Sequence, residues 1–116
     1  MTTSEAPLLT WLRICPAERL WPERGAAALL PDGGQVALFR TADGAVHAVG
    51  NIDPCTGAAV LSRGIVGDRA GRPVVVSPML KHAFDLVTGE CVDDPTITVP
   101  VYPVRTADGV VEVGLR

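Results

Sequence analysis

Turn-forming residues interrupt this chain so often that long helices have no room to form. The sequence contains 12 glycines and 10 prolines among 116 residues. Proline breaks a helix interior because it lacks a backbone donor and clashes with the preceding turn. The apolar stretches between these interruptions have the length of strands, which is about five or six residues. The pattern predicts an all-β domain of short antiparallel strands in packed sheets, as a sandwich or barrel.

Eight short segments, each bounded by turn residues, have the composition of strands. We expect strands over residues 10–15, 26–30, 35–41, 45–50, 73–76, 83–87, 96–101 and 110–115. A single helical turn is expected over residues 17–20, because Pro16 ends the first strand.

The five residues Arg-Thr-Ala-Asp-Gly occur twice, at 40–44 and again at 105–109. The similarity stops at the turn, so a larger internal repeat is not indicated. Asp-Gly is a strong signal for a two-residue hairpin connection, because both residues tolerate positive φ. We therefore predict two hairpins with the same turn chemistry, at Asp43-Gly44 and at Asp108-Gly109.

The bulk composition limits the number of domains and the class of partner. We expect a disordered lead-in over residues 1–8 and a single domain over residues 9–116. The net charge of −3 gives no basis for nucleic-acid binding, which needs a basic face. No apolar run approaches the roughly 20 residues that span a bilayer. The N-terminus lacks a signal-peptide pattern and the three cysteines are an odd number, which indicates a cytoplasmic protein.

Several segments of the chain resemble one protein family. The residues that carry the resemblance are Asn-Ile-Asp-Pro at 51–54, Val-Leu-Ser-Arg-Gly-Ile-Val-Gly-Asp at 60–68, Val-Ser-Pro at 76–78 and Val-Pro-Val-Tyr-Pro-Val-Arg at 99–105. They are similar to the small subunits of cytoplasmic NAD(P)H-dependent nitrite reductases, which have a Rieske-like fold. The resemblance covers roughly residues 10–115, and Phe-Asp-Leu-Val-Thr-Gly-Glu at 84–90 is shared with true Rieske ferredoxins.

The resemblance implies that the two loops of a Rieske cluster site are present but that their metal ligands are not. A Rieske [2Fe–2S] centre is held by two cysteines and two histidines, one of each from either loop. The resemblance places the first ligand pair at Asp53 and Cys55 and the second at Ser77 and Leu80. All four positions are changed, so the family implies a Rieske-like domain without a cluster. We expect this chain to hold no cofactor and no metal.

The resemblance also implies a function. The chain would be a non-catalytic small subunit that stabilises or positions a large subunit, its partner. The large subunit would carry FAD, an iron–sulfur cluster and sirohaem, and would reduce nitrite to ammonium with electrons from a nicotinamide. Contact with this partner is expected at the loop tips, through Pro54, Cys55, Met79, Lys81 and His82. Two alternatives stay open at this point: a Rieske-type electron carrier for an oxygenase, and a stand-alone binding module.

The same loop residues allow three other interpretations. Asp53, Cys55 and His82 would supply three zinc ligands if the loops converge. Cys55 would become a nucleophile if His82 or Lys81 lowered its pKa, although the nearby Asp53 opposes a thiolate. An ordinary loop thiol and a surface histidine are the simpler interpretation. Leu80 either fills the space of the lost cluster or joins an apolar spot with Met79.

Overall fold

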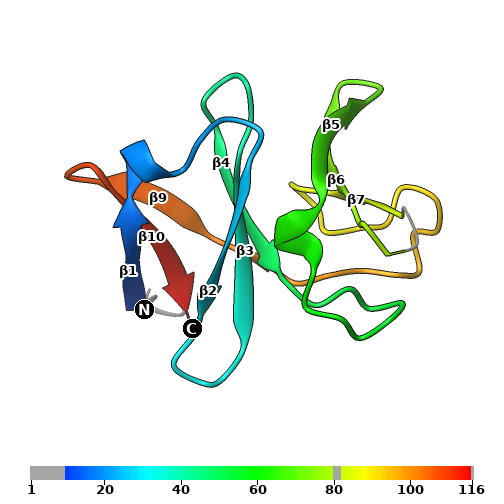
Figure 1. The fold of residues 1–116 in the computed structure, drawn as a ribbon, viewed down its shortest axis with the longest axis horizontal. Helices are drawn as coiled ribbons and strands as arrows, with labels where there is room; N and C mark the ends of the chain where they lie inside the picture. Colours follow the sequence, from blue (N-terminus) through cyan, green and yellow to red (C-terminus); the bar gives the residue numbers. More distant parts are fainter. Residues whose placement is uncertain (1–9, 80–81, 116) are drawn as a thin grey trace, which may run out of the picture.

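Three small antiparallel sheets lie side by side along the molecule (Figure 1). This computed structural model describes residues 10–79 and 82–115, so the expected lead-in over 1–8, Leu80 and Lys81 lie outside the described residues. The four-stranded sheet β2–β3–β4–β8 stands between the sheets β1–β10–β9 and β5–β6–β7. The all-β class with short antiparallel strands is confirmed. Among the described residues, no helix is long and apolar enough to cross a membrane.

The elements are short, as the density of turn residues requires. The strands are Thr10–Pro16 (β1), Gly25–Leu29 (β2), Gln35–Arg40 (β3), Val46–Gly50 (β4), Ile65–Arg69 (β5), Arg72–Val76 (β6), Ala83–Asp85 (β7), Val101–Tyr102 (β8), Val104–Ala107 (β9) and Val110–Leu115 (β10). Two single 3₁₀ turns, Ala17–Arg19 (η2) and Leu61–Arg63 (η3), complete the described elements.

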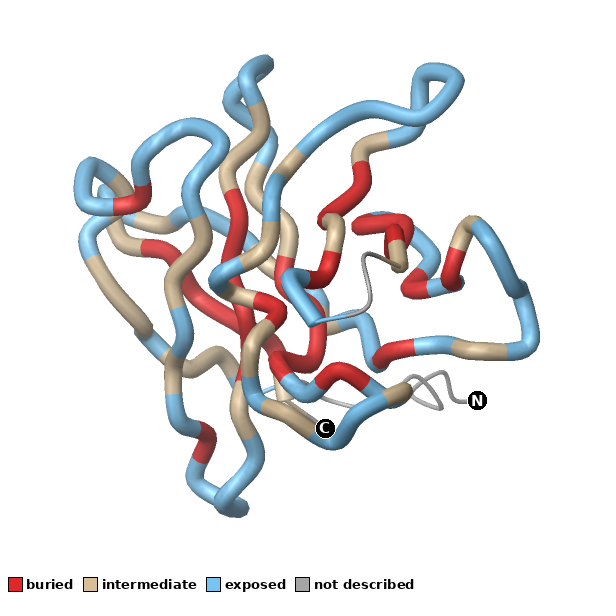
Figure 2. The backbone as a smooth tube through the Cα atoms, turned by 45° about the vertical axis from the view of Figure 1, so that its right-hand side comes forward, coloured by how far each residue is buried: buried red, intermediate tan, exposed pale blue. Residues whose placement is uncertain are grey.

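The central sheet is covered on both faces, and strand β3 shows this most clearly. Successive side chains of a strand point to opposite faces. Val36 and Leu38 pack into the core shared with β10, whereas Ala37 and Phe39 pack into the core shared with β6 and β7. All four are completely buried. The buried segments accordingly gather in the middle of the molecule (Figure 2).

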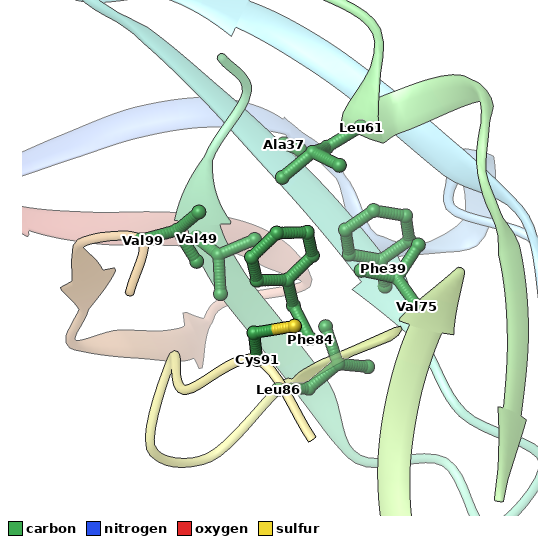
Figure 3. Close-up of a cluster of buried hydrophobic side chains, with 9 residues drawn as sticks. All are labelled: Ala37, Phe39, Val49, Leu61, Val75, Phe84, Leu86, Cys91 and Val99. Atoms are coloured by element: carbon green, nitrogen blue, oxygen red, sulfur yellow. The ribbon is translucent and has the colours of Figure 1, made fainter. Parts of the chain in front are cut away.

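The core between the central sheet and β5–β6–β7 fixes the two loops that matter for function. Figure 3 shows its side chains pointing toward one another from both sheets and from the loop after β7. Leu61 of η3 enters this core at the end of the first loop. Phe84 enters it from β7, directly after the second loop. The same hydrophobic contacts that hold the sheets together therefore also set where the two loops end.

Most of the predicted strands are confirmed, and two predictions need correction. The strand expected over 96–101 is wrong except for Val101, because Thr96 lies in a turn and Thr98 makes only an isolated bridge. The strand expected over 83–87 ends at Asp85. The Asp85 carboxylate accepts the backbone N–H groups of Val87 at 2.7 Å and Thr88 at 3.0 Å, which turns the chain. Strands β5 and β9 and the turn η3 were not among the expected segments.

The two Arg-Thr-Ala-Asp-Gly segments form different turns, so the prediction of one shared turn is wrong. Asp108 and Gly109 both have positive φ, 52° and 77°, and form the expected two-residue connection between β9 and β10. In the first hairpin only Gly44 has positive φ, 92°, and the Thr41 N–H donates to the Ala45 carbonyl, which leaves a three-residue loop. The Asp43 carboxylate accepts the Thr41 hydroxyl and the Ala45 N–H, and so stabilises this longer turn.

The shared core predicts that one residue controls the stability of the loop-bearing sheet. Phe84→Ala removes a completely buried ring between two sheets and should lower the free energy of unfolding by about 3–5 kcal/mol. Val87→Ala is the matched control, since Val87 is 58% exposed nearby and should change stability by less than about 0.5 kcal/mol. Urea unfolding followed by circular dichroism measures both. Equal effects of the two substitutions would contradict this description of the core.

Candidate functional site at the two loop tips

Two loops from different parts of the chain meet beside β5–β6–β7. The first connects β4 to η3, and the second connects β6 to β7. Ser77 Oγ donates a hydrogen bond of 2.5 Å to Asp53 Oδ2, and both residues are completely buried. This bond, which we call the loop cross-link, joins residues that are 24 positions apart in the sequence.

The cross-linked residues also organise the backbone of their own loops. The Asp53 carbonyl accepts the Gly57 N–H at 2.7 Å, and Asp53 Oδ1 accepts the Cys55 N–H at 2.8 Å. In the second loop the Ser77 N–H donates to the His82 carbonyl at 2.8 Å. Both carboxylate oxygens of Asp53 therefore bind protein donors, one within its loop and one across to the other loop.

Asn51 holds the stem of the first loop, a role that the sequence analysis missed. It is buried, and its side-chain oxygen accepts the Ser62 N–H at 2.8 Å. Its side-chain amide donates to Gln35 Oε1 at 3.0 Å, which ties the loop to strand β3. An asparagine two residues before an Asp-Pro pair suggests a turn, but nothing in the sequence indicates partners 11 and 16 residues away.

Cys55 and His82 form a second contact between the loops. Cys55 Sγ lies 3.2 Å from His82 Nδ1, and both side chains are half-buried. Burial raises the pKa of the Cys55 thiol, and the negative charge of Asp53 raises it further. A thiol ordinarily titrates near about 8.5, so at neutral pH Cys55 is protonated. The expected proximity of Cys55 to His82 is thus present, but the environment opposes a nucleophilic thiolate.

The residues proposed for zinc do not converge as a ligand set. Cys55 touches His82, whereas the third expected ligand, Asp53, directs its oxygens at Ser77 Oγ and the Cys55 N–H. In the part of the chain that the structure describes, no three His, Cys, Asp or Glu side chains gather closely enough for a metal ion. The other expected contact residues, Pro54 and Met79, are exposed on the same two loops, and Met79 is 51% exposed.

Comparison with known proteins places this geometry in a family. The model of the Rieske-like [2Fe-2S] domain matches residues 10–114. The nitrite reductase (NADH) small subunit of Escherichia coli K12 is 41% identical over 104 residues, which are 89% of this chain and 95% of that protein. A crystal structure from Mycobacterium tuberculosis, assigned as an NADH-dependent nitrite reductase small subunit, is 55% identical with a TM-score of 0.92 and covers 95% of this chain and 98% of its own.

The chain belongs to the family of Rieske-like nitrite reductase small subunits.

One further relative has the domain inside a much longer protein. The nitrite reductase [NAD(P)H] large subunit of Klebsiella oxytoca is 38% identical over 108 residues, which are 93% of this chain but 11% of that protein.

The side chains at the family's cluster positions differ from the ligands of a Rieske centre. A Rieske centre needs two thiolates and two imidazoles. The three described positions carry the Asp53 carboxyl, the Cys55 thiol and the Ser77 hydroxyl, and Asp53 and Ser77 are bonded to each other. His82 lies two residues beyond the fourth position, which Leu80 occupies outside the described residues. These residues do not fit a [2Fe–2S] cluster.

The loop cross-link should contribute measurably to stability. A double-mutant cycle of Asp53→Ala and Ser77→Ala should give a coupling of about 1.5–3 kcal/mol, because the bond is buried and involves an acidic partner. Thr41 and Asp43 provide a matched hydroxyl–carboxylate pair in an exposed turn, for which about 0.5 kcal/mol or less is expected. Urea unfolding measures both cycles. A coupling at Asp53–Ser77 no larger than that of the exposed pair would contradict the assigned role.

Proposed function

We propose that this chain is the non-catalytic small subunit of an NAD(P)H-dependent nitrite reductase, in which it stabilises or positions the large subunit. The observation that carries the proposal is the Asp53–Ser77 bond, because it keeps two Rieske-type loops in place with a carboxyl and a hydroxyl instead of the thiolates and imidazoles that a Rieske centre needs. A domain that keeps the loops and not the ligands is suited to protein contact rather than to electron transfer.

Two relatives support this assignment, one by its name and one by its domain arrangement. The Escherichia coli relative is named a nitrite reductase (NADH) small subunit and matches over nearly its whole length. In the Klebsiella oxytoca relative the equivalent domain belongs to the same polypeptide as the large subunit. Fusion of the two parts in one chain keeps them close together, so the partner we propose is the nitrite reductase large subunit.

The remaining parts of the proposal concern the complex as a whole. The large subunit would carry FAD, an iron–sulfur cluster and sirohaem, and would reduce nitrite to ammonium with electrons from NADH or NADPH. The small subunit would be non-catalytic, and burial and the charge of Asp53 raise the pKa of Cys55, which opposes its use as a nucleophile. We place the complex in the cytoplasm, where reduced nicotinamide is available.

The alternative functions lack a specific supporting observation. An electron carrier for an oxygenase would need the Cys and His ligands that Asp53, Cys55 and Ser77 replace. A metal-binding module would need a third ligand beside Cys55 and His82, and Asp53 is directed away to Ser77.

The proposal is tested by preparing the large subunit with and without this chain. We expect the two to co-elute in size-exclusion chromatography, and we expect the large subunit to keep nitrite reductase activity longer on heating. At a chain concentration about 100 times the Kd, binding would stabilise the large subunit by about 2.7 kcal/mol. The Phe84→Ala variant, which loses core packing, is the control for non-specific effects. Separate elution, with unchanged turnover and heat stability, would contradict the proposal.

A further inference from the structure

The described exposed residues at the two loop tips carry no charge; Lys81, in the second loop, lies outside the described residues. Residues 54–61 and 77–79 contain no Asp, Glu, Lys or Arg, although one residue in five of the whole chain is charged, 20%. The nearest carboxylate, that of Asp53, is completely buried in the loop cross-link. We call the exposed residues of these two segments the loop-tip surface, and they are Pro54, Thr56, Gly57, Ala59, Pro78 and Met79.

Met79 differs from the other large exposed apolar side chains because the other loop, which is linked to its own at Ser77, also presents uncharged residues; Lys81 follows Met79 by two positions in the sequence. Trp21 is 64% exposed but is followed closely by Glu23 and Arg24. Ile65 is 73% exposed at the start of β5, a strand that ends with Asp68 and Arg69. Single apolar residues among charges are ordinary on protein surfaces and need no partner. The loop-tip surface is different because apolar and small residues continue over both loops.

Charged groups begin at the edge of this surface. Asp93 Oδ2 accepts the N–H of Ala83, the residue after His82, at 3.5 Å. Asp94 follows Asp93 in the same exposed turn. An uncharged centre that contains methionine, surrounded by a polar rim, is the usual anatomy of a protein–protein interface.

The described parts of the two loops are also linked to each other before any partner arrives. The bond between Asp53 and Ser77 and the contact between Cys55 and His82 link the loops at two points. A surface that is already ordered loses less conformational entropy on binding than two free loops would. The buried bond between Asp53 and Ser77 fixes the position of one loop relative to the other. This is useful if a partner binds to the surface that the two loops form together.

We propose that the loop-tip surface is the site where this chain binds the nitrite reductase large subunit, an inference that rests on the proposed function. The complementary surface on the large subunit is apolar and uncharged at its centre. The fused Klebsiella oxytoca relative supports this choice of partner, because there the domain and the large subunit form one polypeptide.

The test places a negative charge at the centre of the surface. Met79→Asp should weaken binding to the large subunit by about 10- to 100-fold, because the charge is desolvated without a partner. Pro54→Asp is a second variant from the other loop, with the same expected direction. Leu29→Asp is the matched control, since Leu29 is 71% exposed at the end of β2, outside the two loops. Titration of each full-length variant onto the large subunit gives the Kd, and circular dichroism confirms folding.

The possible results separate the two proposals. Weak binding by both tip variants, with the control within about threefold of the unaltered chain, supports the loop-tip surface. Normal binding by a folded Met79→Asp and a folded Pro54→Asp overturns it, while the proposed function stands. Equal weakening by Leu29→Asp also overturns it, because the loss would not be specific to the tips. No binding by the unaltered chain overturns the proposed function and this inference with it.

Discussion

The hydrogen bond between Ser77 and Asp53 is the interaction on which the architecture of the loop tips depends. Burying a carboxyl and a hydroxyl costs free energy unless each finds a partner. Here each satisfies the other at 2.5 Å, and the second carboxylate oxygen of Asp53 accepts a backbone N–H of its own loop. The bond can form only when both loops are in place, so it makes the position of one loop depend on the other. In the related cluster-binding domains iron would provide that link.

The hydrophobic core explains why these two side chains meet at all. Strand β3 supplies buried residues to both faces of the central sheet, so the same strand anchors two cores. Leu61 and Phe84 bring the ends of the two loops into one of these cores. Asn51 then ties the start of the first loop to the neighbouring strand. Packing in the core thus fixes where the two loops end, and the described parts of the tips extend from these anchored ends.

The sequence predicted the strands whose residues alternate between faces or lie between clear turn signals, such as 35–41 and 110–115. It did not predict β5, because most of this strand is exposed and it contains Gly67, which weakens the usual pattern. The repeated Asp-Gly pairs predicted two turns but not their types. The Asp43 carboxylate accepts hydrogen bonds from Thr41 and Ala45 in a three-residue loop, whereas Asp108 has positive φ in a two-residue loop. The same five residues therefore form loops of different length, and the pairing of the flanking strands determines which length is adopted.

The candidate site was predicted in part. The resemblance indicated that Asp53, Cys55 and Ser77 stand at ligand positions, but the bond between Asp53 and Ser77 depends on how close two loops approach, which no local pattern contains. In this domain, side chains replace iron in joining the two loops. Iron analysis and the visible absorption spectrum of the chain, prepared without oxygen and with iron supplied, test this most directly, with a Rieske ferredoxin prepared in parallel as the control. We predict no stoichiometric iron and no cluster absorption bands. A chain that carries two irons with the spectrum of a [2Fe–2S] centre would contradict the claim.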